Sequence, residues 1–161
     1  MCGVFGIWGH AEASNITYLG LHGLQHRGQE SAGIVTSDGA KLYSYKRMGR
    51  VADAFDADAL DALPGTNAIG HVRYSTAGSS NLKNAQPFAV EFGGTSLAIA
   101  HNGNLTNAMS LRERLEADGA LFHSTMDTEV IVHLLARSKG KLVDRVKAVT
   151  PMLEGAYSLL I

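Results

Sequence analysis

The chain has 161 residues, of which 45% are hydrophobic and 18% charged, and its 15 acidic and 14 basic residues give a formal net charge of −1. This length corresponds to one domain with a substantial core, and the composition excludes a disordered tail. The balanced charge gives no support for binding nucleic acid, and no apolar run approaches the ~18 residues that span a bilayer. We therefore expect neither nucleic acid nor a membrane as a partner.

The cysteines and histidines of the sequence limit which disulfides and metal sites the chain can form. Cys2 is the one cysteine, so the chain holds neither an internal disulfide nor a multi-cysteine metal site. The seven histidines form neither an HExxH nor an HxH pattern, and we expect no bound metal. The start of the chain has no basic region before its apolar stretch, unlike a signal peptide. These features favour a cytoplasmic protein.

The first half of the chain predicts short strands with helices between them. Alternating β-formers and turn residues predict strands at 2–8, 32–36, 41–47 and 68–72, and apolar periodicity predicts helices at 14–24 and 51–63. Ser14 is expected to cap the first helix, whose apolar face carries Ile16 and Leu19. The turn at 37–40 is typical of a hairpin.

The second half opens with a long polar loop at 73–87, RYSTAGSSNLKNAQP. Loops of this length inside compact domains are usually functional or disordered. The remaining pattern predicts a hairpin of 88–92 with 96–101, helices at 106–118, 128–139 and 142–153, and a final buried strand. Leu111 and Leu115 are expected to face inward.

The last six residues, AYSLLI, include five that are apolar or aromatic. Because chain termini are usually exposed, an ending of this kind indicates that the sequence is part of a longer protein. An unpaired strand edge there would also favour self-association into a homo-oligomer.

Cys2 is the first candidate for catalysis. It follows Met1 directly, so removal of the methionine would leave a thiol and a free α-amine on one residue. Their reference pKa values, near 8.5 and 7.7–8.0, allow the amine to take the proton of the thiol. This is a nucleophile with its own base and needs no histidine. The alternative is that Cys2 is a small buried hydrophobe.

Four further segments carry candidate binding or supporting groups. Arg73 opens the polar loop in HVRYSTAG and is either a bidentate carboxylate clamp or a solvated side chain. In AHNGNLTN, the Asn102 amide and the Gly103 N–H form either an oxyanion hole or an ordinary turn. Asp127 stands at a helix entrance, where it either binds an ammonium group or caps the helix. In LQHRGQESAGI, Arg27 either supports a site or closes a helix.

Taken together, these segments resemble the class II glutamine amidotransferases, whose glutaminase is an N-terminal-nucleophile hydrolase. The resemblance runs from MCGVFGIWG to EGAYSLLI. LQHRGQESAGI, HVRYSTAG, QPF, AHNGNLTN and GAYSLLI look like the branch that transfers glutamine nitrogen to phosphoribosyl pyrophosphate in the first committed step of purine synthesis. The sugar-phosphate branch has an RGYDSAG-like segment and a THG-like continuation instead.

The resemblance implies a catalytic role for three residues. Cys2, after loss of Met1, would attack the side-chain amide of glutamine and form a glutamyl-thioester, and water would then release glutamate. Its α-amine would act first as base and then as acid toward the leaving ammonia. Asn102 and the Gly103 N–H would hold the tetrahedral oxyanion.

The resemblance also implies how glutamine is held. Arg73 would bind its α-carboxylate, and Asp127 would bind its α-ammonium group. Thr76, in a mobile glutamine loop, would contact the substrate as well. Arg27 is expected to order the Cys2 terminus rather than to take part in chemistry.

The fold that the resemblance implies is α+β, with two antiparallel sheets between helical layers (αββα), and hairpins outnumber βαβ crossovers in the sequence as this requires. Residues 1–161 would form a glutaminase domain that lacks its C-terminal strands. The phosphoribosyltransferase domain, which would bind phosphoribosyl pyrophosphate with magnesium and receive the ammonia, is absent, so we expect no cofactor here. The alternative is a truncated or engineered module that binds glutamine, or a partner, without catalysis.

Overall fold

A computed structural model describes residues 2–74 and 81–161. Its strands are β1 (Gly3–Ile7), β2 (Ser31–Ser37), β3 (Leu42–Met48), β4 (Asn67–Arg73), β5 (Phe88–Phe92), β6 (Thr95–Leu105) and β7 (Gly155–Leu160). Its helices are α1 (Ala13–Gly23), α2 (Val51–Ala54), α3 (Ala57–Asp61), α4 (Ala108–Ala117), α5 (Asp127–Arg137) and α6 (Leu142–Val149). The chain divides into two compact units, one of residues 1–102 with 158–161 and one of residues 103–157.

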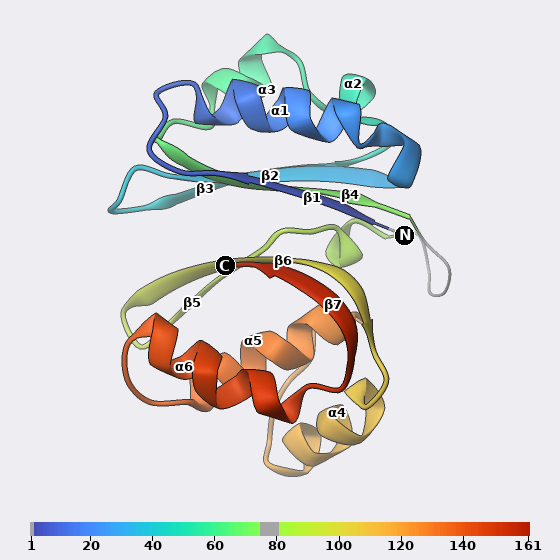
Figure 1. Cartoon of the computed structure of the whole chain (residues 1–161), viewed down its shortest axis with the longest axis vertical. Coiled ribbons are helices and arrows are strands. Elements are labelled where there is room, and N and C mark those ends of the chain that lie inside the picture. Colours follow the sequence, from blue (N-terminus) through green and yellow to red (C-terminus); the bar gives the residue numbers. More distant parts are fainter. Residues whose placement is uncertain (1, 75–80) are drawn as a thin grey trace. The chain divides into compact units, whose positions relative to one another are not determined.

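The first sheet has four strands in the order β1-β4-β2-β3, and every neighbouring pair is antiparallel. Helix α1 packs against β1, β2 and β4, and α2 packs against β2 and β3 (Figure 1). Apolar side chains between these layers form a core that includes the fully buried Leu21, Ile34, Val51 and Val72. The predicted hairpin of β2 and β3 is confirmed.

Helix α1 buries a different face from the predicted one. It begins at Ala13 after the N-cap residue Glu12, so Ser14 lies inside the helix and does not cap it. Leu19, predicted to face inward, is 65% exposed. The reason is the contact with β1: Gly20 lies against the Phe5 ring, where any Cβ would collide, and this contact turns Leu19 to the outside.

The predicted helix over 51–63 is two short helices. Helix α2 ends at Ala54, and Phe55 and Asp56 adopt extended backbone before α3. The Asp56 carboxylate accepts a hydrogen bond from the Ala59 N–H at 2.9 Å and caps the new helix. The buried Phe55 ring packs against Tyr45, which holds the chain close to the sheet at the break.

The second sheet has the strand order β5-β6-β7. The predicted hairpin of β5 and β6 is confirmed, with Phe88 opposite Ile99. Strand β6 runs on to Leu105, so Asn102 and Gly103 lie in a strand and not in a turn. The predicted final strand forms as β7, but its residues are exposed or half-buried rather than buried.

The unit of residues 103–157 contains the other three helices. Helix α4 packs against α5, and α5 against α6. As predicted, Leu111 and Leu115 are buried in this unit. The predicted helix at 142–153 ends at Val149 and continues as a 3₁₀ turn over Thr150–Met152.

The fold is thus α+β with two antiparallel sheets and helices, as predicted. Among the described residues, no helix is long and apolar enough to cross a membrane.

Candidate active site

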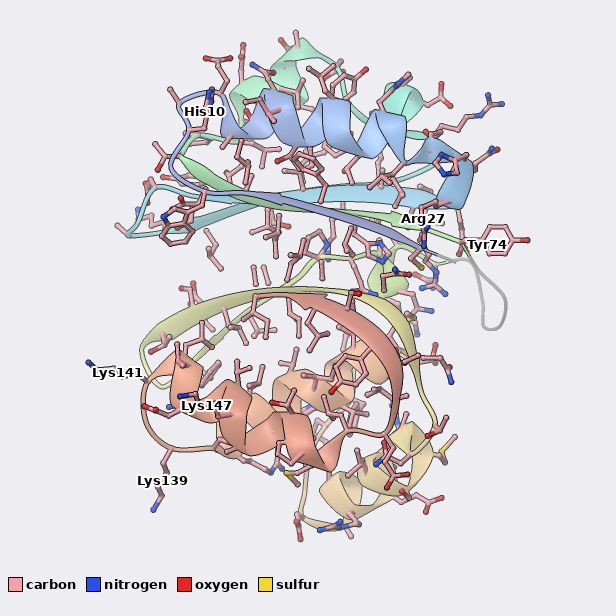
Figure 2. The ribbon with its side chains drawn as sticks, viewed as in Figure 1. His10, Arg27, Tyr74, Lys139, Lys141 and Lys147 are labelled. Atoms are coloured by element: carbon pink, nitrogen blue, oxygen red, sulfur yellow. The ribbon has the colours of Figure 1, made fainter. Side chains whose placement is uncertain are left out.

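Cys2 lies immediately before β1, beside the end of β4. The register pairs Gly3 with Val72, and the Cys2 Sγ lies 3.8 Å from the backbone oxygen of Tyr74. The Arg27 Nε donates a 2.9 Å hydrogen bond to the Cys2 carbonyl. Figure 2 shows Arg27 at this end of the first sheet and the Tyr74 ring pointing away from it. Cys2 itself is half-buried, and Arg27 makes the contact that an ordering role for the Cys2 terminus requires.

Arg73, the last residue of β4, is a buried cation with an internal partner. Its side chain is 3% exposed, and its Nε lies 3.4 Å from the Glu30 Oε1. Its Nη1 also donates a 2.8 Å hydrogen bond to the Asn84 carbonyl. Arg73 is therefore not a solvated side chain. The structure shows its guanidinium bound to an internal carboxylate.

The turn before β2 approaches the backbone of Arg73 closely. A Cβ on Gly28 would lie 2.5 Å from both the carbonyl carbon and the oxygen of Arg73. Two residues on, the Glu30 N–H donates to that same oxygen at 3.1 Å. Glycine at position 28 thus lets this turn lie against the end of β4, and this brings Arg27 and Glu30 to Cys2 and Arg73.

Two histidines and a glutamine are buried behind this end of the sheet. His71 Nε2 lies 3.1 Å from the His101 backbone oxygen, and the His101 N–H donates to Gln86 Oε1 at 2.8 Å. His71, Gln86 and His101 are each at most 2% exposed. Burial lowers the pKa of His71 to about 3, because the charged imidazolium would lose its hydration. His71 is therefore neutral near pH 7.

Asn102 and Gly103 continue β6 beyond His101. Asn102 is half-buried, and Gly103 is exposed with a φ of +150°. A Cβ on Gly103 would collide with the backbone of Ala156 and Tyr157 in β7. Position 103 thus requires glycine for two reasons, namely the positive φ of its backbone and its close approach to β7.

Asp127 is the first residue of α5, at the predicted helix entrance. Its Oδ2 accepts a 3.1 Å hydrogen bond from the Leu105 N–H, at the end of β6. Glu129, also in the first turn, accepts from the backbone N–H groups of His123 and Ser124. In this unit the Asp127 carboxylate therefore ties the start of α5 to the end of β6.

The predicted site residues are distributed over both units. Cys2, Arg27, Arg73 and Asn102 belong to the unit of residues 1–102 with 158–161, and the first three lie together at the end of β4. Gly103 and Asp127 belong to the unit of residues 103–157. Thr76 lies outside the described residues. Within the described ranges, no group of three or more His, Cys, Asp or Glu side chains could hold a metal ion.

Sequence reasoning missed three residues beside the site, namely the half-buried Glu30 and the buried His71 and Gln86. The signal for Glu30 was its place in LQHRGQESAGI, where an acid stands between apolar segments. His71 shares HVRYSTAG with Arg73, and strand alternation puts both on one face of β4. Gln86 is the first residue of the QPF segment, but its partner His101 is fifteen residues away, and no local pattern joins the two.

Comparisons with known proteins place the chain in a family. A family model described as a glutamine amidotransferase domain matches residues 71–161, more than half of the chain. The curated amidophosphoribosyltransferase of Bacillus subtilis (strain 168) is 53% identical over 163 residues, which cover 99% of this chain and 34% of the relative. The match to this relative includes the region of Cys2, which lies outside the match to the family model.

Two solved structures agree with this result. Glutamine phosphoribosylpyrophosphate amidotransferase from B. subtilis, complexed with ADP and GMP, superposes with a TM-score of 0.92 at 49% identity, over 99% of this chain and 34% of that one. A structure described as the allosteric regulatory enzyme of purine biosynthesis gives a TM-score of 0.94 at 50% identity, over 99% and 35%. The chain spans about a third of the length of these relatives. It belongs to the glutamine amidotransferase domain family, and its similar relatives there are amidophosphoribosyltransferases.

Proposed function

We propose that this chain hydrolyses the side-chain amide of glutamine, with Cys2 as the nucleophile. The observation that carries the proposal is the setting of Cys2, which is half-buried beside the end of β4 with its carbonyl bound by Arg27. A merely structural cysteine of this size would be expected in the core. The family of the chain supports the same chemistry.

The reaction requires removal of Met1, which frees the α-amine of Cys2. The amine takes the thiol proton, and the sulfur attacks the side-chain carbonyl carbon of glutamine. Collapse of the tetrahedral intermediate breaks the C–N bond, and the α-ammonium group of Cys2 gives its proton to the leaving nitrogen, which departs as ammonia. A water then adds to the thioester, which releases glutamate and restores the thiol. Asn102 and the Gly103 N–H would stabilise the oxyanion in both steps.

Binding of the free amino acid needs one group for each of its charges. We assign the α-carboxylate to Arg73 and the α-ammonium group to Asp127, with Thr76 as a further contact. These assignments are supported by the resemblance and by charge complementarity. Arg73 already pairs with Glu30, so Glu30 would hold the guanidinium in place for its substrate role.

In the whole protein, we propose that the ammonia passes to phosphoribosyl pyrophosphate and yields phosphoribosylamine, the first committed step of purine synthesis. The proposal is supported by the similar relatives, which are amidophosphoribosyltransferases about three times as long as this chain. A phosphoribosyltransferase domain would supply the phosphoribosyl pyrophosphate site, with its magnesium.

Intact-protein mass spectrometry, before and after an electrophilic glutamine analogue, tests the glutaminase proposal. We expect the loss of one methionine and one adduct, mapped to Cys2 and blocked by excess glutamine. The unlabelled protein should produce glutamate and ammonia. The Cys2→Ser variant should form no adduct and show no turnover, but it should still bind glutamine.

Two results would contradict the proposal. Processed protein that gives no adduct and no turnover would show that Cys2 is not a nucleophile in this chain. If the unmodified chain without Met1 bound glutamine but did not hydrolyse it, the result would favour the non-catalytic module instead.

A further inference from the structure

Strand β6 is held at His101, one residue before Asn102, by side chains from two other segments. The His101 N–H donates to Gln86 Oε1 at 2.8 Å, and the His101 carbonyl lies 3.1 Å from His71 Nε2. A carbonyl oxygen only accepts, so Nε2 carries the hydrogen of the neutral imidazole. Both backbone polar groups of His101 are therefore bonded to buried side chains.

Gln86 extends the ladder between β5 and β6 with its side chain. The register pairs Phe88 with Ile99 and Ala89 with Ala98. Two residues beyond this ladder, the same register places Gln86 opposite His101. The amide oxygen of Gln86 thus serves as the acceptor for His101 at a position that precedes the start of β5.

Gln86 is in turn fixed to the first sheet. Its backbone carbonyl lies against Gly33 of β2, where any Cβ would collide with it. The preceding carbonyls are also bound: that of Ala85 accepts from Lys46 Nζ at 3.2 Å, and that of Asn84 from Arg73 Nη1 at 2.8 Å. The segment that carries Gln86 is therefore held against β2, β3 and β4.

His71 lies on the face of the first sheet that the Gln86 segment contacts. Its neighbour Gly70 faces α1, where a Cβ would meet Thr17 and Leu21, so His71 points to the opposite face. His71 is fully buried, and its Nδ1 has no hydrogen-bond partner among the described residues. A buried polar group with an unpaired atom is costly. An imidazole here is thus explained by its bond to the His101 carbonyl and not by packing.

We propose that His71 and Gln86 are positioning residues that fix Asn102 by holding the backbone of His101 on both sides. This inference rests on the proposed function, in which Asn102 stabilises the oxyanion. A donor of this kind must lie about 2.7–3.1 Å from the oxyanion, and a displacement of about 1 Å can cost a hundredfold in rate. His71 and Gln86 themselves touch neither glutamine nor the thioester.

The test compares His71→Leu, which removes the donor, with His71→Gln, which keeps an N–H donor of similar reach. Val72→Ala is the matched control, since Val72 is fully buried in the same strand and faces α1 instead. Each rate is divided by the concentration of Cys2 that reacts with the glutamine analogue. Misfolded protein, which does not react, is thereby left out of the rate per site. We expect His71→Leu to lower kcat per titrated site about 10- to 100-fold with little change in KM. His71→Gln should restore most of it, and Val72→Ala should lower only the titrated fraction.

An equal kcat per titrated site in His71→Leu and the parent would overturn the inference while leaving the proposed function intact. A parent without adduct or turnover would overturn the proposed function instead. In that case amide hydrogen exchange still tests the positioning itself. Exchange at His101 and Asn102 should accelerate at least tenfold in His71→Leu and Gln86→Leu beyond its value in Val72→Ala, and equal exchange in all three variants would refute the role.

Discussion

The guanidinium of Arg73 forms a buried ion pair with the carboxylate of Glu30, with Nε and Oε1 3.4 Å apart and side-chain exposures of 3% and 13%. The two residues also face each other through their backbones, since the Glu30 N–H donates to the Arg73 oxygen. Removal of one partner of such a pair leaves the other charge buried and uncompensated, which costs much more than loss of an exposed pair.

Glu30→Gln is therefore expected to lower the free energy of unfolding by about 3 kcal/mol, because the buried Arg73 would keep its charge without this carboxylate. Urea denaturation measures the effect. Glu116→Gln is the control, since the Arg112–Glu116 pair has a 48% exposed carboxylate and should cost less than about 0.5 kcal/mol. Equal losses in the two variants would show that burial does not strengthen the Arg73–Glu30 pair.

Two glycines of α1 should respond in opposite directions to alanine. Gly20→Ala would force the Phe5 ring away and should destabilise the protein by about 1–3 kcal/mol. Gly23 has no atom within 4 Å of an added Cβ and no positive φ, so Gly23→Ala should stabilise by about 0.5 kcal/mol. Thermal unfolding of both variants measures the difference, and destabilisation by Gly23→Ala would contradict this account of α1.

The secondary structure was predictable where the signal is local. The hairpin of β2 and β3 and that of β5 and β6 follow from alternation together with glycine-containing turns. The inward face of α1 was not predictable in this way, because Leu19 is excluded by the contact of Gly20 with Phe5 in another element. Composition also could not show that Asp56 caps a second helix inside the segment 51–63.

The candidate site was predictable in its residue types but not in their partners. Arg73 stood out as a cation at the end of a strand, yet its pair Glu30 lies 43 positions away in the sequence. The sequence places Asp127 at a helix entrance, but its bond to Leu105 depends on the path of β6. Such pairings are set by tertiary packing, which a pattern within one segment does not contain.

The buried His71 predicts a loss of stability in acid. Burial lowers its pKa from 6.5 to about 3, so between these values the unfolded chain binds a proton that the folded chain does not. The folded state therefore loses up to about 1.4 kcal/mol per pH unit as the pH falls below about 6.5. His71→Gln removes this term, so its free energy of unfolding should fall less steeply between pH 6 and pH 4.

Urea denaturation at several pH values compares the parent with His71→Gln. Val72→Ala provides the control, because it alters a fully buried position in the same strand without removing a titratable group and should keep the slope of the unmodified protein. Parallel curves for His71→Gln and the parent would mean that His71 takes up its proton without unfolding, against the burial seen here.

Asp127 offers a way to separate substrate binding from structure at one carboxylate. Its Oδ2 accepts the Leu105 N–H at 3.1 Å, and an asparagine oxygen at this position can accept the same hydrogen bond. Asp127→Asn should therefore change the free energy of unfolding by less than about 1 kcal/mol, whereas Asp127→Ala leaves the N–H unpaired and should cost about 1–3 kcal/mol.

Glutamine binding should respond differently to the same two changes. If Asp127 holds the α-ammonium group, both variants lose its charge and both should raise KM at least tenfold, because a charge-assisted hydrogen bond contributes about 1.5–3 kcal/mol. Steady-state kinetics and denaturation of the same preparations give the two readouts. A stable Asp127→Asn variant with the KM of the parent would restrict Asp127 to its structural bond, and the ammonium group would then need another partner.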